Sequence, residues 1–156
     1  MARIFISYRR DDSGGWAGRL YDRLSQHFRR ENVFMDIDTI EPGLDFVEVI
    51  EQAVGSCDAL IALIGKQWLT ITDAAGQRRL DNPEDFVRLE IAAALARNIR
   101  LIPALVQGAR MPGSTDLPDV LKMLARRNAH EISDRRFHSV RVVGHWAIVA
   151  RPDYGQ

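Results

Sequence analysis

Glu90 is a carboxylate in the middle of an apolar helical stripe, within the stretch FVRLEIAAAL. Its neighbours one helical turn away on either side are all apolar: Phe86, Val87, Ala93 and Ala94. Two interpretations are open. The carboxylate lies at the edge of the stripe and reaches solvent or Arg97 on the same face, or it lies in an apolar cleft, where it would stabilise a developing positive charge.

The elements that must position Glu90 alternate along the chain. Short apolar segments predict buried strands at residues 4–6, 33–35, 59–64 and 101–106, with an edge strand at 129–132. Amphipathic segments predict helices at residues 16–28, 46–54, 83–98 and 117–124. This alternation predicts an α/β fold, an open parallel sheet with helices on both faces.

In such sheets, ligands bind beyond the carboxyl ends of the strands. The loops that carry function are therefore expected at residues 7–15, 36–45 and 65–82. Tyr8, Arg9 and Arg10 fall in the first loop and Trp68 in the third, so we expect their side chains at one edge of the sheet.

Composition limits the class of protein. The chain has 156 residues, of which 46% are hydrophobic and 27% charged, as in one globular domain. Lys+Arg and Asp+Glu are balanced at 21 each, which argues against general nucleic-acid binding. The longest apolar run, residues 59–64, is too short to span a membrane, and no signal peptide is recognised, so we expect a cytoplasmic protein.

Several kinds of chemistry find no support in the motifs. No G-x-G-x-x-G follows a strand and no phosphate-binding P-loop motif occurs. A phospho-receiver needs an aspartate at the end of the central strand, where this chain has Ile64, Gly65 and Lys66. Cys57 is the single cysteine, and the four histidines are scattered without metal-ligand spacing. We therefore expect no metal and no resident cofactor.

Four motifs in order resemble a TIR domain (Toll/interleukin-1 receptor domain), of the bacterial NAD⁺-cleaving kind. They are FISYRRDDS, FMDIDTIEPGLDF, ALIALIGKQWL and DFVRLEIAAAL, at residues 5–13, 34–46, 59–69 and 85–95. The resemblance covers residues 1–133 and implies a flavodoxin-like, five-stranded sheet. It also implies that NAD⁺ is the substrate and that Glu90 is the catalytic residue. The products would be nicotinamide and ADP-ribose, or a cyclic isomer.

The resemblance suggests roles for the residues at the carboxyl edge of the sheet. Arg9 or Arg10 would hold the pyrophosphate of NAD⁺, and Tyr8 would line the adenine side. Trp68 would stack on the cationic nicotinamide ring. The structural alternatives are that the arginines pair with nearby aspartates and that Trp68 fills the core beside the third helix. The aspartates in question are Asp11, Asp12 and Asp36.

Residues 36–45 correspond to the BB loop of TIR domains, which mediates assembly and borders the active site. Ile40, Glu41, Pro42 and Gly43 would make assembly contacts, while Ile37 and Asp38 would close over the substrate. The resemblance implies activation by homotypic TIR–TIR association, in bacterial antiphage defence or virulence, with a sensor domain or a partner protein as trigger. The alternative function is a non-catalytic adaptor that signals through the same contacts.

Residues 134–156 depart from the family pattern, in which an amphipathic helix follows the last strand. The stretch VRVVGHWAIVA is rich in β-branched residues and contains a glycine. It predicts a strand, a swapped segment or an exposed association site instead of that helix.

Overall fold

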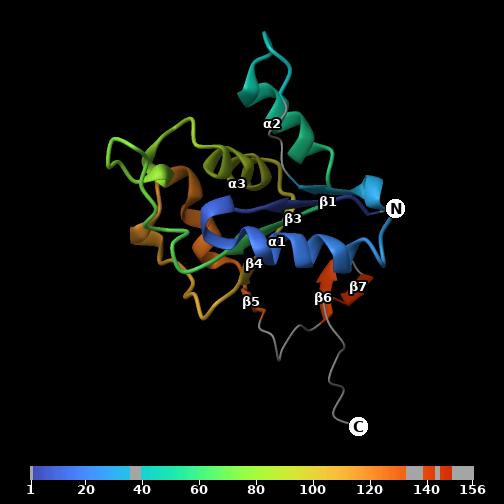
Figure 1. Cartoon of the computed structure of the whole chain (residues 1–156). Coiled ribbons are helices and arrows are strands. Elements are labelled where there is room, and N and C mark those ends of the chain that lie inside the picture. The colour runs from blue at the N-terminus through green and yellow to red at the C-terminus, as the bar shows by residue number, and fades with distance from the viewer. Residues whose placement is uncertain (1, 36–39, 133–138, 143–144, 149–156) are drawn as a thin grey trace.

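The computed structural model describes residues 2–35, 40–132, 139–142 and 145–148. Its centre is an all-parallel sheet of five strands in the order β2-β1-β3-β4-β5 (Figure 1). The strands are β1 (Ile4–Ser7), β2 (Val33–Met35), β3 (Ala59–Ile64), β4 (Arg100–Leu105) and β5 (His130–Glu131). The predicted open parallel sheet is confirmed, and its strand order is that of a flavodoxin-like fold.

Helices cover both faces of the sheet (Figure 1). On one side, α1 (Arg10–Leu24) packs Leu20 and Leu24 against Ile4 and Ile6 of β1. On the other side, α2 (Phe46–Gly55) and α3 (Phe86–Ala96) pack against Phe5 and against the β3 side chains that lie on that face of the sheet. Strand side chains alternate between two cores, which explains why all six residues of β3 are buried.

The third helix begins later than its sequence signals predict. Asn82 and Pro83 predict a helix start, but Asn82 Oδ1 accepts the backbone N–H of Glu84 (3.0 Å) and closes a turn. Asp85 is the N-cap and accepts the N–H of Arg88 (3.1 Å), so α3 starts at Phe86. The cap therefore places Phe86 in the first turn and Glu90 one turn further along.

The predicted fourth helix is the 3₁₀ helix η4 (Asp119–Arg126). Its buried residues, Leu121 and Leu124, are three positions apart, which matches the three-residue turn of a 3₁₀ helix. The connections contain three shorter 3₁₀ turns: η1 (Arg30–Asn32), η2 (Arg79–Asp81) and η3 (Ser114–Asp116).

The C-terminal segment forms the antiparallel pair β6 (Ser139–Val142) and β7 (His145–Ile148), which lies beside α1 (Figure 1). The predicted extended structure is confirmed here. Because β6 pairs with β7 and not with the main sheet, the hairpin is an addition to the five-stranded core. The domain boundary at residue 133 stays a prediction.

Candidate functional site

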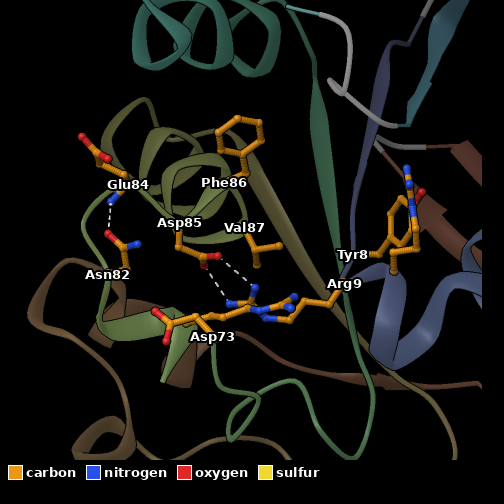
Figure 2. Close-up of a pocket in the computed structure, with 10 residues that line it drawn as sticks. Tyr8, Arg9, Asp73, Asn82, Glu84, Asp85, Phe86 and Val87 are labelled. Carbon is orange, nitrogen blue, oxygen red and sulfur yellow. Dashed lines mark hydrogen bonds and ion pairs between the residues drawn. The ribbon is translucent and has the colours of Figure 1, made fainter. Parts of the chain in front are cut away.

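A cleft of about 400 Å³ opens at the carboxyl edge of the sheet (Figure 2). Three segments line it: residues 8–10 after β1, the connection that leads to α3, and Phe86 and Val87 in the first turn of α3. Its volume lies in the range typical of small-molecule sites. Arg9, Arg10 and Arg79 supply the positive charges of the wall, and three carboxylates balance them.

Glu90 is buried next to this cleft, with 7% of its surface exposed. Ser7 Oγ, at the end of β1, donates a 2.8 Å hydrogen bond to Glu90 Oε1. Arg97 pairs instead with Glu51 (3.8 Å), so a carboxylate at the stripe's edge, in solvent or paired with Arg97, is excluded. Glu90 itself is not in the cleft wall. Two residues of the wall are close to the Ser7–Glu90 pair in the chain: Tyr8 follows Ser7, and Val87 lies three residues before Glu90 on the same helix.

Arg9 clamps the two elements that carry this pair. Its guanidinium donates to both oxygens of Asp85 (Nη1–Oδ1 2.9 Å, Nη2–Oδ2 2.7 Å), as Figure 2 shows. Its Nε donates to the carbonyl oxygen of Trp68 (3.3 Å), and the residue is only 4% exposed. A bidentate arginine–carboxylate pair fixes both distance and orientation. Arg9 thus joins β1, the loop after β3 and the start of α3.

The structural alternative to pyrophosphate binding, in which Arg9 pairs with Asp11 or Asp12, is not found, because both aspartates have other partners. Asp12 accepts the backbone N–H groups of Gly65 (2.9 Å) and Gln67 (2.8 Å). Asp11 contacts Arg79 at 3.3 Å. Asp36, the third aspartate considered, lies outside the described residues.

The predicted stacking of Trp68 on a ligand is contradicted, because its side chain is 0% exposed. A turn closed by the hydrogen bond from the Trp68 N–H to the Gly65 carbonyl oxygen (3.2 Å) follows β3. The indole lies in the core cluster with Leu80 and Val87, as the structural alternative proposed. Its Nε1 has no hydrogen-bond partner among the described residues, so packing alone holds the ring there.

Phe86 is the aromatic residue of the cleft wall that the sequence reasoning missed. It is 39% exposed, and its ring stacks on Phe46 of α2 with centroids 5.4 Å apart. Figure 2 shows the ring on the side of α3 that faces α2. The sequence could have predicted this from the position of Phe86 four residues before Glu90, because residues i and i+4 share a helix face.

The remaining predicted residues lie at or near the same edge. Tyr8 is half-buried and Arg10 exposed, and both line the cleft. Glu41 to Leu44 form a type II turn in which Gly43 has φ +90° and the Leu44 N–H donates to the Glu41 carbonyl oxygen (3.2 Å). Ile40 is half-buried, whereas Pro42 and Gly43 are exposed. Ile37 and Asp38 lie outside the described residues, and the binding and assembly roles of all these residues stay predictions.

Within the described ranges, no group of three or more metal-ligating side chains is close enough to hold a metal ion. No helix in the same ranges has the length and apolar character needed to cross a membrane.

The strand order, the helices on both faces and the cleft at the carboxyl edge define a flavodoxin-like α/β domain. A family model described as the TIR domain matches residues 4–139, and the chain therefore belongs to the TIR-domain family. The resemblance in the four motifs is thereby confirmed at the level of the family.

Solved structures agree on the fold. The TIR domains of the activated Roq1 resistosome, which recognises the pathogen effector XopQ, superpose with a TM-score of 0.61 at 12% identity, over 87% of this chain and 90% of theirs. The TIR domain of the Toll-related receptor TRR-2 from Hydra magnipapillata has a TM-score of 0.56 at 16% identity, over 86% and 87%. A conserved protein from Enterococcus faecalis V583 has a TM-score of 0.50 at 16% identity, over 86% and 92%. A search of curated protein sequences finds no match.

Proposed function

We propose that this TIR domain is an NAD⁺ glycohydrolase that cleaves the bond between nicotinamide and ribose. The observation that carries the proposal is the buried Ser7–Glu90 pair near a cleft lined by three arginines and three carboxylates. A carboxylate costs free energy to bury, and it persists at such a position when its hydrogen bonds and its function compensate. The resemblance of the four motifs to NAD⁺-cleaving TIR domains supports Glu90 as the catalytic residue of this proposal.

The reaction needs an anion close to the ribose. As the C1′–N bond breaks, its electron pair moves to the nicotinamide nitrogen, and the cationic ring leaves as neutral nicotinamide. Positive charge builds on the ribose, and a fixed carboxylate in a water-poor environment stabilises that charge more than one in water. Water then adds to C1′ and loses a proton, which gives ADP-ribose; attack by an atom of the adenine ring instead gives a cyclic isomer.

The cleft provides complementary groups for the rest of a dinucleotide. Phe86 offers an exposed aromatic face one helical turn from Glu90, so it replaces Trp68 as the proposed stacking partner of the nicotinamide ring. Arginines line the same cleft, where they would attract the diphosphate. Tyr8 would lie against the adenosine part.

Assembly of several TIR domains is proposed as the trigger, in bacterial defence or virulence. The exposed turn at residues 41–44 carries Leu44, an apolar side chain that is 54% exposed. The turn leads directly into α2, whose first residue Phe46 stacks on Phe86 in the cleft wall. A contact made by the turn of one copy would therefore act on the cleft through Phe46.

The test measures nicotinamide release from NAD⁺ by chromatography, with the purified chain at high concentration. Glu90→Gln keeps the shape of the side chain and removes its charge, so we expect release to fall by a factor of about 10³ or more. Glu31→Gln is the matched control, because Glu31 is exposed and precedes β2 at the opposite edge of the sheet. Equal release by wild type and Glu90→Gln would refute the assignment.

The second candidate is a non-catalytic adaptor, which the exposed Leu44 favours. An adaptor would release no nicotinamide even when the domains are clustered on a multivalent scaffold. It would still self-associate, and Leu44→Asp would abolish that association. Release that appears on clustering and disappears in Glu90→Gln supports the enzyme instead.

A further inference from the structure

Arg79, one of the arginines that line the cleft, is much more weakly paired than Arg9. Its Nη2 contacts Asp11 Oδ2 at 3.3 Å, and among the described residues this is the one polar partner of its side chain. The side chains of Arg79 and Asp11 are 35% and 64% exposed. By contrast, Arg9 is 4% exposed and donates three hydrogen bonds, two to the carboxylate of Asp85 and one to the carbonyl oxygen of Trp68. An exposed, single-contact ion pair adds little stability and exchanges readily for another anion.

The segment that carries Arg79 is well ordered. Asp73 Oδ1 accepts the backbone N–H groups of Ala75 (2.9 Å) and Gln77 (3.0 Å), and the Arg79 N–H donates to the Ile71 carbonyl oxygen (2.9 Å). These bonds close a hairpin-like turn with Arg79 at its base. The backbone of Arg79 is thus positioned before any ligand arrives, which lowers the entropic cost of binding.

The neighbouring residues anchor the same segment to the fold. Arg78 pairs with both oxygens of Asp81 (2.7 and 3.1 Å) and donates to the carbonyl oxygen of Asp116 (2.6 Å). Leu80 is fully buried, and its carbonyl oxygen accepts a hydrogen bond from Arg88 (3.0 Å). Arg78 and Leu80 therefore have structural partners, whereas Arg79 between them extends into the cleft wall.

We infer that Arg79 binds the diphosphate of a dinucleotide ligand and that Asp11 is the group which the diphosphate displaces. The guanidinium fork matches two phosphate oxygens better than the one carboxylate oxygen of Asp11 that it contacts in the structure. The choice of a dinucleotide as ligand rests on the proposed function. Asp11 thus competes with the ligand and sets its affinity.

The test is calorimetric binding of ADP-ribose, the proposed product, to the full chain without turnover. Arg79→Gln is expected to weaken binding by about ten-fold or more, because a charge-assisted bidentate contact is lost. Asp11→Asn is expected to strengthen binding several-fold, because the competing carboxylate is gone. Arg29→Gln is the matched control and should bind as wild type, since Arg29 is exposed, pairs with Glu31 (3.9 Å) and lies at the opposite edge of the sheet.

Two further probes identify the group that Arg79 recognises. Inorganic pyrophosphate should compete with ADP-ribose for wild type, and adenosine, which lacks phosphate, should bind wild type and Arg79→Gln equally. Equal affinity of wild type and Arg79→Gln for ADP-ribose overturns the inference, as does the absence of ADP-ribose binding to wild type at millimolar concentration. Weaker binding of ADP-ribose by Asp11→Asn also overturns the inference. This variant tests the inference even if Arg79→Gln fails to fold.

The outcomes separate this inference from the proposed function. If the protein releases nicotinamide but Arg79→Gln binds ADP-ribose as tightly as wild type, the proposed enzymatic function stands and the inference about Arg79 is wrong. Arg79-dependent binding without nicotinamide release, even after clustering, would retain the site and reject the enzyme.

Discussion

Ser7 Oγ and Glu90 Oε1 are 2.8 Å apart, although the two residues are separated by 83 positions in the sequence. The hydrogen bond joins the carboxyl end of strand β1 to the middle of α3. Ser7 is 1% exposed and Glu90 7% exposed, so water has little access to the pair. The orientation of the carboxylate therefore depends on Ser7, and through it on the position of the strand.

Ser7→Ala should slow nicotinamide release while leaving KM for NAD⁺ nearly unchanged. The variant removes the donor that orients Glu90, and we expect kcat to fall about ten-fold, in line with the loss of a hydrogen bond to a charged group. The free energy of unfolding should fall by about 1–3 kcal/mol, because a buried carboxylate loses a partner. Ser13→Ala is the control: Ser13 is also buried, but its Oγ has no partner among the described residues. An unchanged kcat in Ser7→Ala would contradict a positioning role.

Asp85→Asn should destabilise the protein far more than the same change at another helix start. Asparagine keeps the N-cap acceptor but leaves the charge of Arg9 buried without its partner, which costs about 3–5 kcal/mol. Asp45 is also an N-cap, of α2, but it is exposed and carries no such pair, so Asp45→Asn should cost less than about 1 kcal/mol. Urea denaturation measures both, and similar losses would show that the Arg9–Asp85 pair adds nothing beyond the cap.

Gly65→Ala should loosen the loop that follows β3. A Cβ at this position would lie 2.6 Å from the Asp12 carboxylate, which holds the N–H groups of Gly65 and Gln67. The carboxylate must move, and we expect a loss of about 1–3 kcal/mol in the free energy of unfolding. Gly18→Ala in α1 meets no atom within 4 Å and should stabilise the protein by about 0.5–1 kcal/mol. Thermal unfolding of the two variants should therefore shift in opposite directions.

The Cys57 thiol should react slowly with alkylating reagents in the folded protein. It should also make the free energy of unfolding depend on pH in the alkaline range. The thiol is 6% exposed, and burial raises its pKa above the usual value of 9.0. The folded state therefore holds the thiol proton more tightly than the unfolded state does. The resulting stability is fully present below pH 9.0 and is lost as the pH rises through the folded pKa.

Two measurements check this expectation for Cys57. Iodoacetamide should alkylate the native protein at pH 8 only at the rate of opening, and urea should accelerate the reaction. The loss of unfolding free energy between pH 8 and pH 10 should be smaller in Cys57→Ala than in wild type. Rapid native alkylation would mean that the thiol is accessible.

Phe86→Ala should raise KM for NAD⁺ several-fold, because the variant removes the exposed ring that is proposed to stack on nicotinamide. The free energy of unfolding should change by only about 1 kcal/mol, since the ring is 39% exposed and its contact is with Phe46. Met123→Ala is the control, because Met123 is 47% exposed on η4 and lies outside the cleft wall. Unchanged KM and kcat in Phe86→Ala would exclude the ring from the site.

The strands and the two cores were predictable because their signals are local. Residues 59–64 form an unbroken apolar run, and such a run in an alternating α/β chain forms a central parallel strand. The boundaries were less predictable where two caps competed. Asn82 and Asp85 both carry N-cap chemistry; in the structure Asn82 closes a turn, and Asp85 caps the helix and also pairs with Arg9, which is distant in the sequence.

In the site, too, the sequence alone determined some features and tertiary structure decided others. By itself, the sequence determined the family, the parallel sheet, the edge of the sheet that carries the cleft and the place of Glu90 in an apolar helical stripe, because these follow from periodicity and from motifs contiguous in the chain. Tertiary structure alone decided that Trp68 lies in the core, that Arg9 pairs with Asp85 and that Ser7 binds Glu90. Each of these contacts joins residues that are far apart in the sequence or depends on which way a loop turns. Such choices are made by packing and by the need of every buried polar group for a partner.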